Sequence, residues 1–587
     1  MKISFRFQNT AASEETRRRR RRSLILASVG IAVLPLAWHG TSCGHDFDFH
    51  LESWMEVVRQ WHQGVFYPHW AASANYGAGE PRFVFYPPMS WMLGALLGLV
   101  LPWTWTPLAF TLILMLAMAA SFFKMASEWI PEDNAALAAC LYVLNPYMLF
   151  AAYERTAYGE LIAAVWLPLL VLYTLRRSSS MPQLALMIAM LWLCNAPAAV
   201  MGCYALALLV LWTAIAGRSW ALIGRAAGAS ALGLGLAAFY LVPAIYEQRW
   251  VEIARAIDPG IRVEDSFLFE HTGQAFHDQV LHTASWIAVA LLAVTAIAAL
   301  FSWMGAARKR DAGEAPSRVR GPLIFLAVII AALLFPFSDA IWRHIPELKF
   351  LQFPWRWLLV LGLVSSLLCG MCLRGEAGTR RNISLRAGAI LLLACVMSGL
   401  ASFYFWTACD DEDNVRAQMA TFHEGGFEGT DEYTATAADN DEIQQSLPSI
   451  RVLRRANDDE GDGAVTANPQ WQAGAADSLP AQIHIGRWDV EHMRAQVDAK
   501  APGFAVLRLM DYPAWRVRLN GVLVKTRPRR EDGLMMVPIP AGRSQIEITY
   551  GTTGDMWAGR VLSLLAFVVL LALRAEQLGL RLPEQVS

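Results

Sequence analysis

The chain has 587 residues, of which 55% are hydrophobic and 17% are charged, and it contains 23 Trp. This balance is more apolar than soluble domains usually are, and it predicts a polytopic membrane protein. The net charge of -1, with the long basic run confined to the N-terminal tail, argues against a nucleic-acid partner.

The N-terminal tail, residues 1–22, ends in six consecutive arginines, Arg17 to Arg22, and an apolar run from Ser23 to Trp38 follows. Lys and Arg are retained on the cytoplasmic side of membranes, which favours a first span with its N-terminus in the cytoplasm. A secretory signal peptide is the alternative, because it also joins a basic region to a short apolar one. No clean small-x-small cleavage site follows the run, which favours the span.

The later apolar runs are centred near residues 94, 116, 143, 167, 188, 207, 235, 292, 329, 365, 396 and 565. The run at 88–101 has only about 14 residues between prolines, too few to cross a ~30 Å hydrocarbon core at 1.5 Å per residue. We therefore expect a juxtamembrane helix there, on the outer side. Twelve spans remain with both termini in the cytoplasm, and Lys124 and the later basic clusters then face inward.

This topology divides the chain into six parts. They are a cytoplasmic basic tail (1–22), a transmembrane module (23–406) with a first outer loop at 39–105, an acidic outer linker (407–475), an outer β-domain (476–555), a final span (556–575) and a cytoplasmic tail (576–587).

The outer β-domain is predicted from alternating residues. "WRVRLNGVLVKT" alternates on both sides of Asn520-Gly521, which is typical of a hairpin, and "RSQIEITYG" predicts another strand. We expect a small β-sandwich. Tyr512 and Trp515 either contact carbohydrate or fill its core, and the core is the favoured interpretation.

Six of the eight cysteines lie in apolar runs, where a thiol behaves as a small hydrophobe, so no disulfide framework is expected. Only Cys43 and Cys409 lie outside such runs, and these two could pair.

The stretch "GHDFDFHLESW", Gly44 to Trp54, places ionisable groups directly after the first span. Four such side chains lie within six positions: His45, Asp46, Asp48 and His50. Apolar residues then recur at helical spacing from Leu51 to Val58, which predicts an amphipathic helix in the membrane interface.

Three hypotheses account for this stretch. Asp46 could be a general base for an acceptor hydroxyl, with His45, Asp48 and His50 orienting it or the substrate. Alternatively, Asp46, Asp48 and His50 ligate a divalent cation such as Mg²⁺ or Mn²⁺, although no third segment shows ligand spacing. In the third hypothesis, Asp46 or Asp48 only caps the amphipathic helix.

Charged residues also lie at the outer ends of later spans. Arg155 and Glu160 in "YERTAYGE" are functional candidates, since ionisable groups at a span boundary are costly unless they face a polar cavity; an anchoring ion pair is the alternative. Lys349 and Arg356 in "LKFLQFPWRWL" could grip a phosphate or could only snorkel to the interface.

Several motifs together resemble a known family. "GHDFDFHLESW", "GVFYPHW", "NYGAGEPRFVFYPP", "YERTAYGE", "FPWRW" and "YPAWRVRLNG" are similar to bacterial multispanning proteins labelled 6-pyruvoyl-tetrahydropterin-synthase-related, of the GT-C superfamily of membrane glycosyltransferases. The resemblance covers nearly the whole chain. Asp46 matches the first-loop acid of the family, but Asp48 stands where a proline is usual, which leaves open which carboxylate acts.

The resemblance implies a GT-C-like α-helical membrane protein of the bacterial inner membrane with an extracytoplasmic active site. Such an enzyme moves a sugar from a polyprenyl-phosphate carrier to a glycan, lipid or protein acceptor. No cofactor is certain, and the divalent cation of the second hypothesis, Mg²⁺ or Mn²⁺, is the one candidate. Catalysis is expected from Asp46 and Asp48, and substrate binding from His45, His50, Tyr86, Arg155, Glu160, Lys349 and Arg356. One carboxylate base predicts inversion. A non-catalytic transporter or polysaccharide-assembly scaffold is the alternative, although polar groups crowd the outer face more than the mid-membrane positions.

Overall fold

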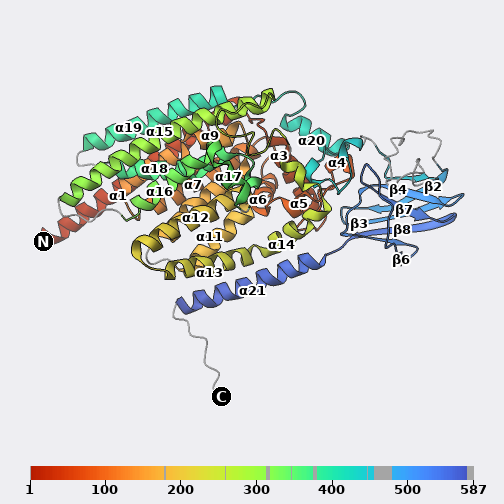
Figure 1. Cartoon of the computed structure of the whole chain (residues 1–587). Coiled ribbons are helices and arrows are strands. Elements are labelled where there is room, and N and C mark those ends of the chain that lie inside the picture. The colour runs from red at the N-terminus through yellow and green to blue at the C-terminus, as the bar shows by residue number, and fades with distance from the viewer. Residues whose placement is uncertain are drawn as a thin grey trace, which may run out of the picture.

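A computed structural model describes residues 2–176, 180–257, 259–311, 318–345, 347–373, 380–443, 445, 447–454 and 479–577. A long body of helices carries a β-domain at one end (Figure 1). Within these residues, seven helices are long and apolar enough to cross a membrane, or up to ten if each of three bent pairs is one span. The expected class, a mostly helical membrane protein with a C-terminal β-domain, is confirmed.

The helical body is built from long apolar helices and bent pairs. The long ones are α7 (Thr106–Ala126), α10 (Tyr158–Leu175), α12 (Ala196–Gly217), α15 (Ala275–Asp311), α18 (Leu358–Cys372), α19 (Arg380–Leu400) and α21 (Gly554–Gln577). The bent pairs are α8 (Glu132–Val143) with α9 (Pro146–Tyr153), α13 (Ala221–Leu236) with α14 (Ala238–Glu247), and α16 (Arg320–Leu333) with α17 (Asp339–His344). At the first bend, Pro146 lacks an N–H for the ladder and the Asn145 side chain caps α9.

The remaining helices include α1 (Lys2–Ala32), α2 (Leu34–His39) and α11 (Met181–Cys194). A helix or a bent pair lies at each of the twelve predicted spans, and the run at 88–101 folds as α6 (Pro88–Gly98), which has only 11 residues. The count of twelve and the orientation in the membrane stay predictions.

Cysteine labelling at the two ends of α7 tests this topology, because Thr104 and Lys124 are both exposed there. We expect Thr104→Cys to react with an impermeant maleimide in intact cells, as should Glu424→Cys, whereas Lys124→Cys reacts only after permeabilisation. The parent chain supplies the background from its native cysteines. An unlabelled Thr104→Cys in intact cells would overturn the twelve-span topology.

The first outer loop folds mainly as α3 (Phe47–His62), the amphipathic helix that the sequence predicts. Leu51 and Trp54 are fully buried, and the Trp54 ring stacks on Phe110 of α7 at 5.0 Å. A Cβ at Gly94 of α6 would lie 2.1 Å from that indole, so only glycine lets the two helices approach. The loop continues through the short helices α4 (Ala74–Gly77) and α5 (Arg82–Phe85).

The β-domain is the predicted sandwich of two antiparallel sheets. One has the order β1 (Ile450–Leu453), β4 (Gly503–Met510), β7 (Leu534–Ile539); the other has the order β2 (Ala481–Trp488), β3 (His492–Ala499), β8 (Gly542–Tyr550), β5 (Trp515–Leu519), β6 (Val522–Leu523). Asn520 and Gly521 turn between β5 and β6 with φ of 51° and 83°, the signs that a tight hairpin needs. Tyr512 and Trp515 are buried in the core, as favoured.

The sandwich begins earlier than the sequence predicts. β1 lies inside the predicted linker 407–475 and pairs with β4, and the linker also contains the helix α20 (Val415–Glu424). All four residues of β1 are buried, so they lack the alternation that marks a strand in sequence. Residues 455–478 of the linker and 578–587 of the C-terminal tail lie outside the described residues.

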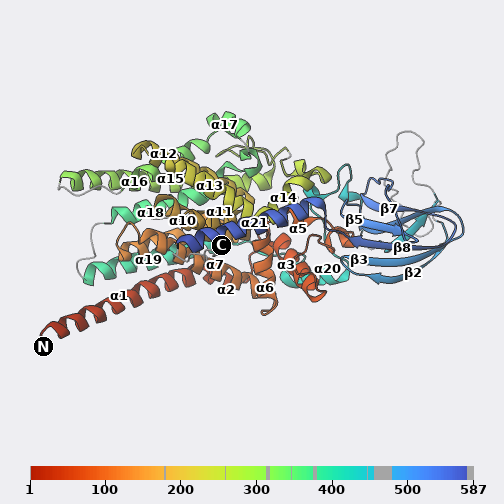
Figure 2. The same cartoon turned by 90° about the horizontal axis from the view of Figure 1, so that it is seen from below.

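After the sandwich the chain returns along the helical body. α21 packs against α13 and α14 (Figures 1 and 2), and Ser563 on α21 donates to the Gly235 carbonyl at 3.1 Å. A disulfide between Cys43 and Cys409 joins the start of the first outer loop to the stretch that follows α19, with a Cα–Cα distance of 4.9 Å. The other six cysteines are free, as the sequence predicts.

Candidate active site

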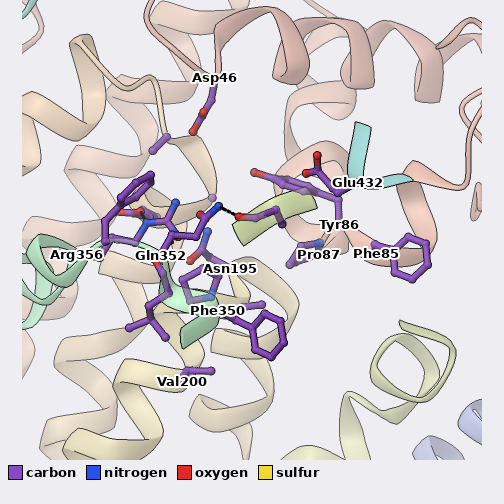
Figure 3. A pocket seen from close by; sticks show the side chains of 18 of the residues that line it. Asp46, Phe85, Tyr86, Pro87, Asn195, Val200, Phe350, Gln352, Arg356 and Glu432 are labelled. Atoms are coloured by element: carbon purple, nitrogen blue, oxygen red, sulfur yellow. Dashed lines mark hydrogen bonds and ion pairs between the residues drawn. The ribbon is translucent and has the colours of Figure 1, made fainter. Parts of the chain in front are cut away.

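A large cavity lies where the first outer loop meets the outer ends of the helices. Its volume is about 1030 Å³. Figure 3 shows Asp46 at one end and Val200 and Phe350 at the other, with Arg356 and Tyr86 on opposite sides between them. The cavity is therefore polar near Asp46 and apolar toward α12.

Asp46 is held in the cavity by its backbone. The N–H groups of His45 and Asp46 donate to the carbonyls of Glu154 and Arg155, both at 3.1 Å. A Cβ at Gly44 would lie 2.3 Å from the Glu154 oxygen, so a glycine is required for the loop to lie this close. The glycine thus places Asp46 beside the "YERTAYGE" turn.

The Asp46 carboxyl makes no hydrogen bond or ion pair with any of the described residues. Asp46 is the N-cap residue of α3, but its carboxyl makes no capping bond. Burial raises the pKa of this carboxyl above its usual range, although Arg155 and Arg356 oppose the shift. The half-buried group therefore faces the cavity with its oxygens available.

Asp48 differs from Asp46 in every one of these respects. It is exposed, it accepts from the Phe49 N–H at 2.7 Å, and it does not line the cavity. The helical turn sends the two side chains in different directions, so the capping bond belongs to Asp48. A catalytic position for Asp48 is not supported.

Two arginines share one glutamate beside Asp46. Arg155 Nη1 donates to Glu160 Oε1 at 2.7 Å, and Arg356 Nε lies 3.3 Å from the same oxygen. The Tyr147 hydroxyl donates to Glu160 Oε2 at 2.8 Å. All three charged side chains line the cavity. Glu160 pairs with both guanidinium groups, and Asp46 is a second carboxylate within reach of their charge.

Aromatic rings and the backbone fix these arginines. The Arg155 guanidinium lies 4.9 Å from the Trp355 ring, and that of Arg356 lies 4.9 Å from the Phe353 ring. Thr156, next to Arg155, has φ of 46°, an unusual value for a β-branched residue, and its hydroxyl donates to the Arg155 carbonyl. Such local strain is common at functional sites.

His45 and Tyr86 also line the cavity, as predicted for substrate-binding residues. The His45 ring stacks on Phe276 at 4.4 Å. Desolvation, aided by the nearby Arg155, lowers the pKa of His45 to about 4, so the ring is neutral at pH 7. Burial raises the pKa of Tyr86, which keeps its hydroxyl protonated.

Two predicted substrate-binding residues lie outside the cavity. His50 is 1% exposed and packs under Tyr86, whose hydroxyl lies 3.5 Å from His50 Nε2. Lys349 is exposed, with its ammonium 5.1 Å from the Phe350 ring. Tyr86 covers His50, and the turn before Arg356 directs Lys349 to the surface. Neither side chain therefore reaches a ligand in this cavity.

The metal hypothesis finds no ligand set in the described part of the chain. No group of three or more His, Cys, Asp and Glu residues there could hold an ion. Asp46, Asp48 and His50 do not converge, because Asp48 points to solvent while Tyr86 covers His50.

Glu432 is a cavity residue that the sequence does not reveal. It belongs to the predicted acidic linker, where one carboxylate among many carries no signal. Burial, together with the nearby Glu80 and Asp431, raises the pKa of Glu432 to about 7. Its segment is held by Glu80, which accepts from the Thr430 N–H at 2.7 Å and from Arg82 Nε at 2.6 Å.

Asn195 and Gln352 line the cavity as well. Asn195 caps α12 through the Ala198 N–H, and the "NAP" break between two apolar runs is the signal that could have pointed to it. Gln352 donates to the Ala256 carbonyl across the cavity wall (Figure 3).

Comparisons with known proteins show the family of this chain and do not show its activity. A family model described as 6-pyruvoyl-tetrahydropterin synthase related domain, membrane protein, matches residues 83–406. No curated protein matches the chain. Two cryo-EM structures of the arabinofuranosyltransferase AftD from Mycobacteria, one of them a mutant, are 13% and 11% identical over 91% of this chain, each with a TM-score of 0.41. The chain spans 57% and 60% of those two chains.

Proposed function

The chain belongs to the family of 6-pyruvoyl-tetrahydropterin synthase related membrane proteins, and from this premise we propose that it is a membrane glycosyltransferase. Its donor is a sugar on a polyprenyl-phosphate carrier, and its acceptor is a glycan, lipid or protein of the cell envelope. One observation carries the proposal: the same cavity combines an available carboxylate, a cationic pair and an apolar end.

The cationic pair suits the phosphate of the donor. Arg155 and Arg356 are pre-positioned by Glu160, so they can stabilise the charge that develops on a departing phosphate without reorganising. Guanidinium groups also match phosphate oxygens in geometry better than ammonium groups do.

The apolar end suits the polyprenyl chain. Val200, Leu234, Ile245 and Phe350 line the cavity there. Leu234 and Ile245 are 39% and 68% exposed, so they offer uncovered apolar surface. A prenyl chain lying against them would bury this surface.

Asp46 supplies the base in this mechanism. It takes the proton of the acceptor hydroxyl while that oxygen attacks the anomeric carbon of the donor sugar. The bond from that carbon to the phosphate oxygen breaks, and the phosphate leaves with the electron pair. A single displacement of this kind inverts the anomeric centre.

The outer side of the bacterial inner membrane is the proposed location. Disulfides persist in oxidising compartments outside the cytoplasm, and the Cys43–Cys409 bridge lies three residues from Asp46. The positive-inside rule places the same loop outside.

Incubating the purified protein with a panel of radiolabelled polyprenyl-phosphate sugars tests the proposal. We expect release of labelled sugar from one donor class, with an acceptor-dependent product of inverted configuration. The Asp46→Asn chain is the control for contaminating activity. Binding of a donor without any transfer would instead favour the non-catalytic scaffold.

A further inference from the structure

A second, smaller pocket lies at the junction of the β-domain and the helical body. Its volume is about 210 Å³, well below that of sites for drug-sized ligands. Its lining is rich in arginine and includes two aromatic residues: Arg249, Arg527, Arg529, Arg530, Trp250 and Tyr512. We call this set of residues the arginine pocket.

The arginine pocket carries more positive charge than its own carboxylates neutralise. Arg527 pairs with Asp511 at 2.7 Å, and Arg530 pairs with Asp532 at 2.6 Å. Arg249 and Arg529 have no acidic partner among the described residues. The Arg249 guanidinium lies 3.7 Å from the Tyr246 ring, so Arg529 is the cation most available to an anionic ligand.

Arg530 provides a second, independent observation that points to an anionic ligand. It is 4% exposed, and its Nε and Nη2 donate to the two oxygens of Asp532 at 2.9 and 2.6 Å. Its Nη1 is buried without a hydrogen-bond partner in the described part of the chain. A buried charged donor is costly when unsatisfied, so this nitrogen favours an acceptor that enters the pocket.

The shape and lining of the pocket suit a sugar. The half-buried Trp250 lies edge-on to Tyr512, with ring centroids 5.5 Å apart, and lines the pocket beside the arginines. The volume has room for one sugar ring and its charged substituent, and not for an extended chain.

The arginine pocket shares two chain segments with the active-site cavity. Gln248 lines the large cavity, and the next two residues, Arg249 and Trp250, line the pocket. Likewise Glu432 and Tyr433 line the cavity, whereas 435–438 line the pocket. The two pockets therefore lie next to each other in the fold.

We propose that the arginine pocket binds an acidic sugar residue of the acceptor glycan through its carboxylate or phosphate. The assignment of this glycan as the acceptor rests on the proposed glycosyltransferase function. Binding of the acidic sugar does not itself require catalysis. The pocket selects an acceptor by a charged residue away from the reacting hydroxyl.

Ligand-observed NMR on the full-length protein in nanodiscs tests this, with glucuronate as the probe and glucose as its neutral match. We expect glucuronate to bind and Arg529→Ala to weaken it by about tenfold, the value for one charged hydrogen bond. Arg529 is exposed, so its substitution leaves the fold intact; Arg543→Ala, an equally exposed arginine of β8 outside the pocket, is the matched control and should bind normally.

Equal binding of glucose and glucuronate, or equal binding by the Arg529→Ala and Arg543→Ala chains, would overturn the proposal. Inorganic phosphate that binds as tightly as glucuronate would show a site for a simple anion and would overturn the sugar assignment. The Asp46→Asn chain should bind glucuronate like the parent. The two proposals can therefore fail separately. A protein that binds glucuronate but transfers no sugar would contradict only the proposed enzymatic function.

Discussion

Asp46→Asn should lower the rate of sugar transfer by about 10²–10⁴-fold, the range typical when a general base is lost. The amide keeps the shape of the side chain and removes its ability to take a proton. Little structural cost is expected, because the carboxyl caps no helix and accepts no hydrogen bond from the described residues. Initial rates with the donor identified in the panel, together with a thermal unfolding curve, measure both effects.

Asp48→Asn is the matched control, since Asp48 is exposed and, among the described residues, bonds only to the Phe49 N–H. Its rate should stay close to that of the parent. The pH profile provides a second readout: the base must be ionised, so activity should rise as pH passes the raised pKa of Asp46, above the usual value of about 3.9. Full activity of Asp46→Asn would remove Asp46 from the mechanism.

Arg356→Ala should reduce kcat/KM for the polyprenyl-phosphate donor by about 10²–10³-fold, as expected when one donor to a developing negative charge is removed. Glu160 keeps its bonds from Arg155 and Tyr147 in this variant, so the buried carboxylate does not lose all its partners. The fold should therefore survive, which monodisperse elution in detergent would verify.

Lys349→Ala is the control for the loss of positive charge near this site, because Lys349 is exposed and does not line the cavity. It should transfer sugar at the parental rate. Arg356→Lys keeps the charge without the forked geometry and should recover only part of the activity. Parental rates for both Arg356→Ala and Arg155→Ala would show that these arginines only anchor helices.

Local patterns in the sequence predict the apolar helices and one hairpin of the β-domain. The length of an apolar run is a local property, so each of the twelve predicted spans coincides with a helix or bent pair, and the run at 88–101 is too short. The turn at Asn520-Gly521 and the helical spacing after Leu51 are equally local, and both predictions are confirmed. In such segments the backbone preference and the side-chain pattern agree.

Which side chains meet depends on contacts between segments that are far apart in the chain. Nothing in the sequence distinguishes Asp46 from Asp48. In the fold, the close approach of Gly44 to Glu154 places Asp46 at the cavity. The Cys43–Cys409 bridge closes 366 residues, and β1 is a strand because β4 pairs with it. The same holds for the arginine pocket, which gathers Arg249 with Arg527, Arg529 and Arg530 from the β-domain. A site of this kind depends on contacts between distant segments, and no local pattern of polarity encodes which distant segment will be the partner.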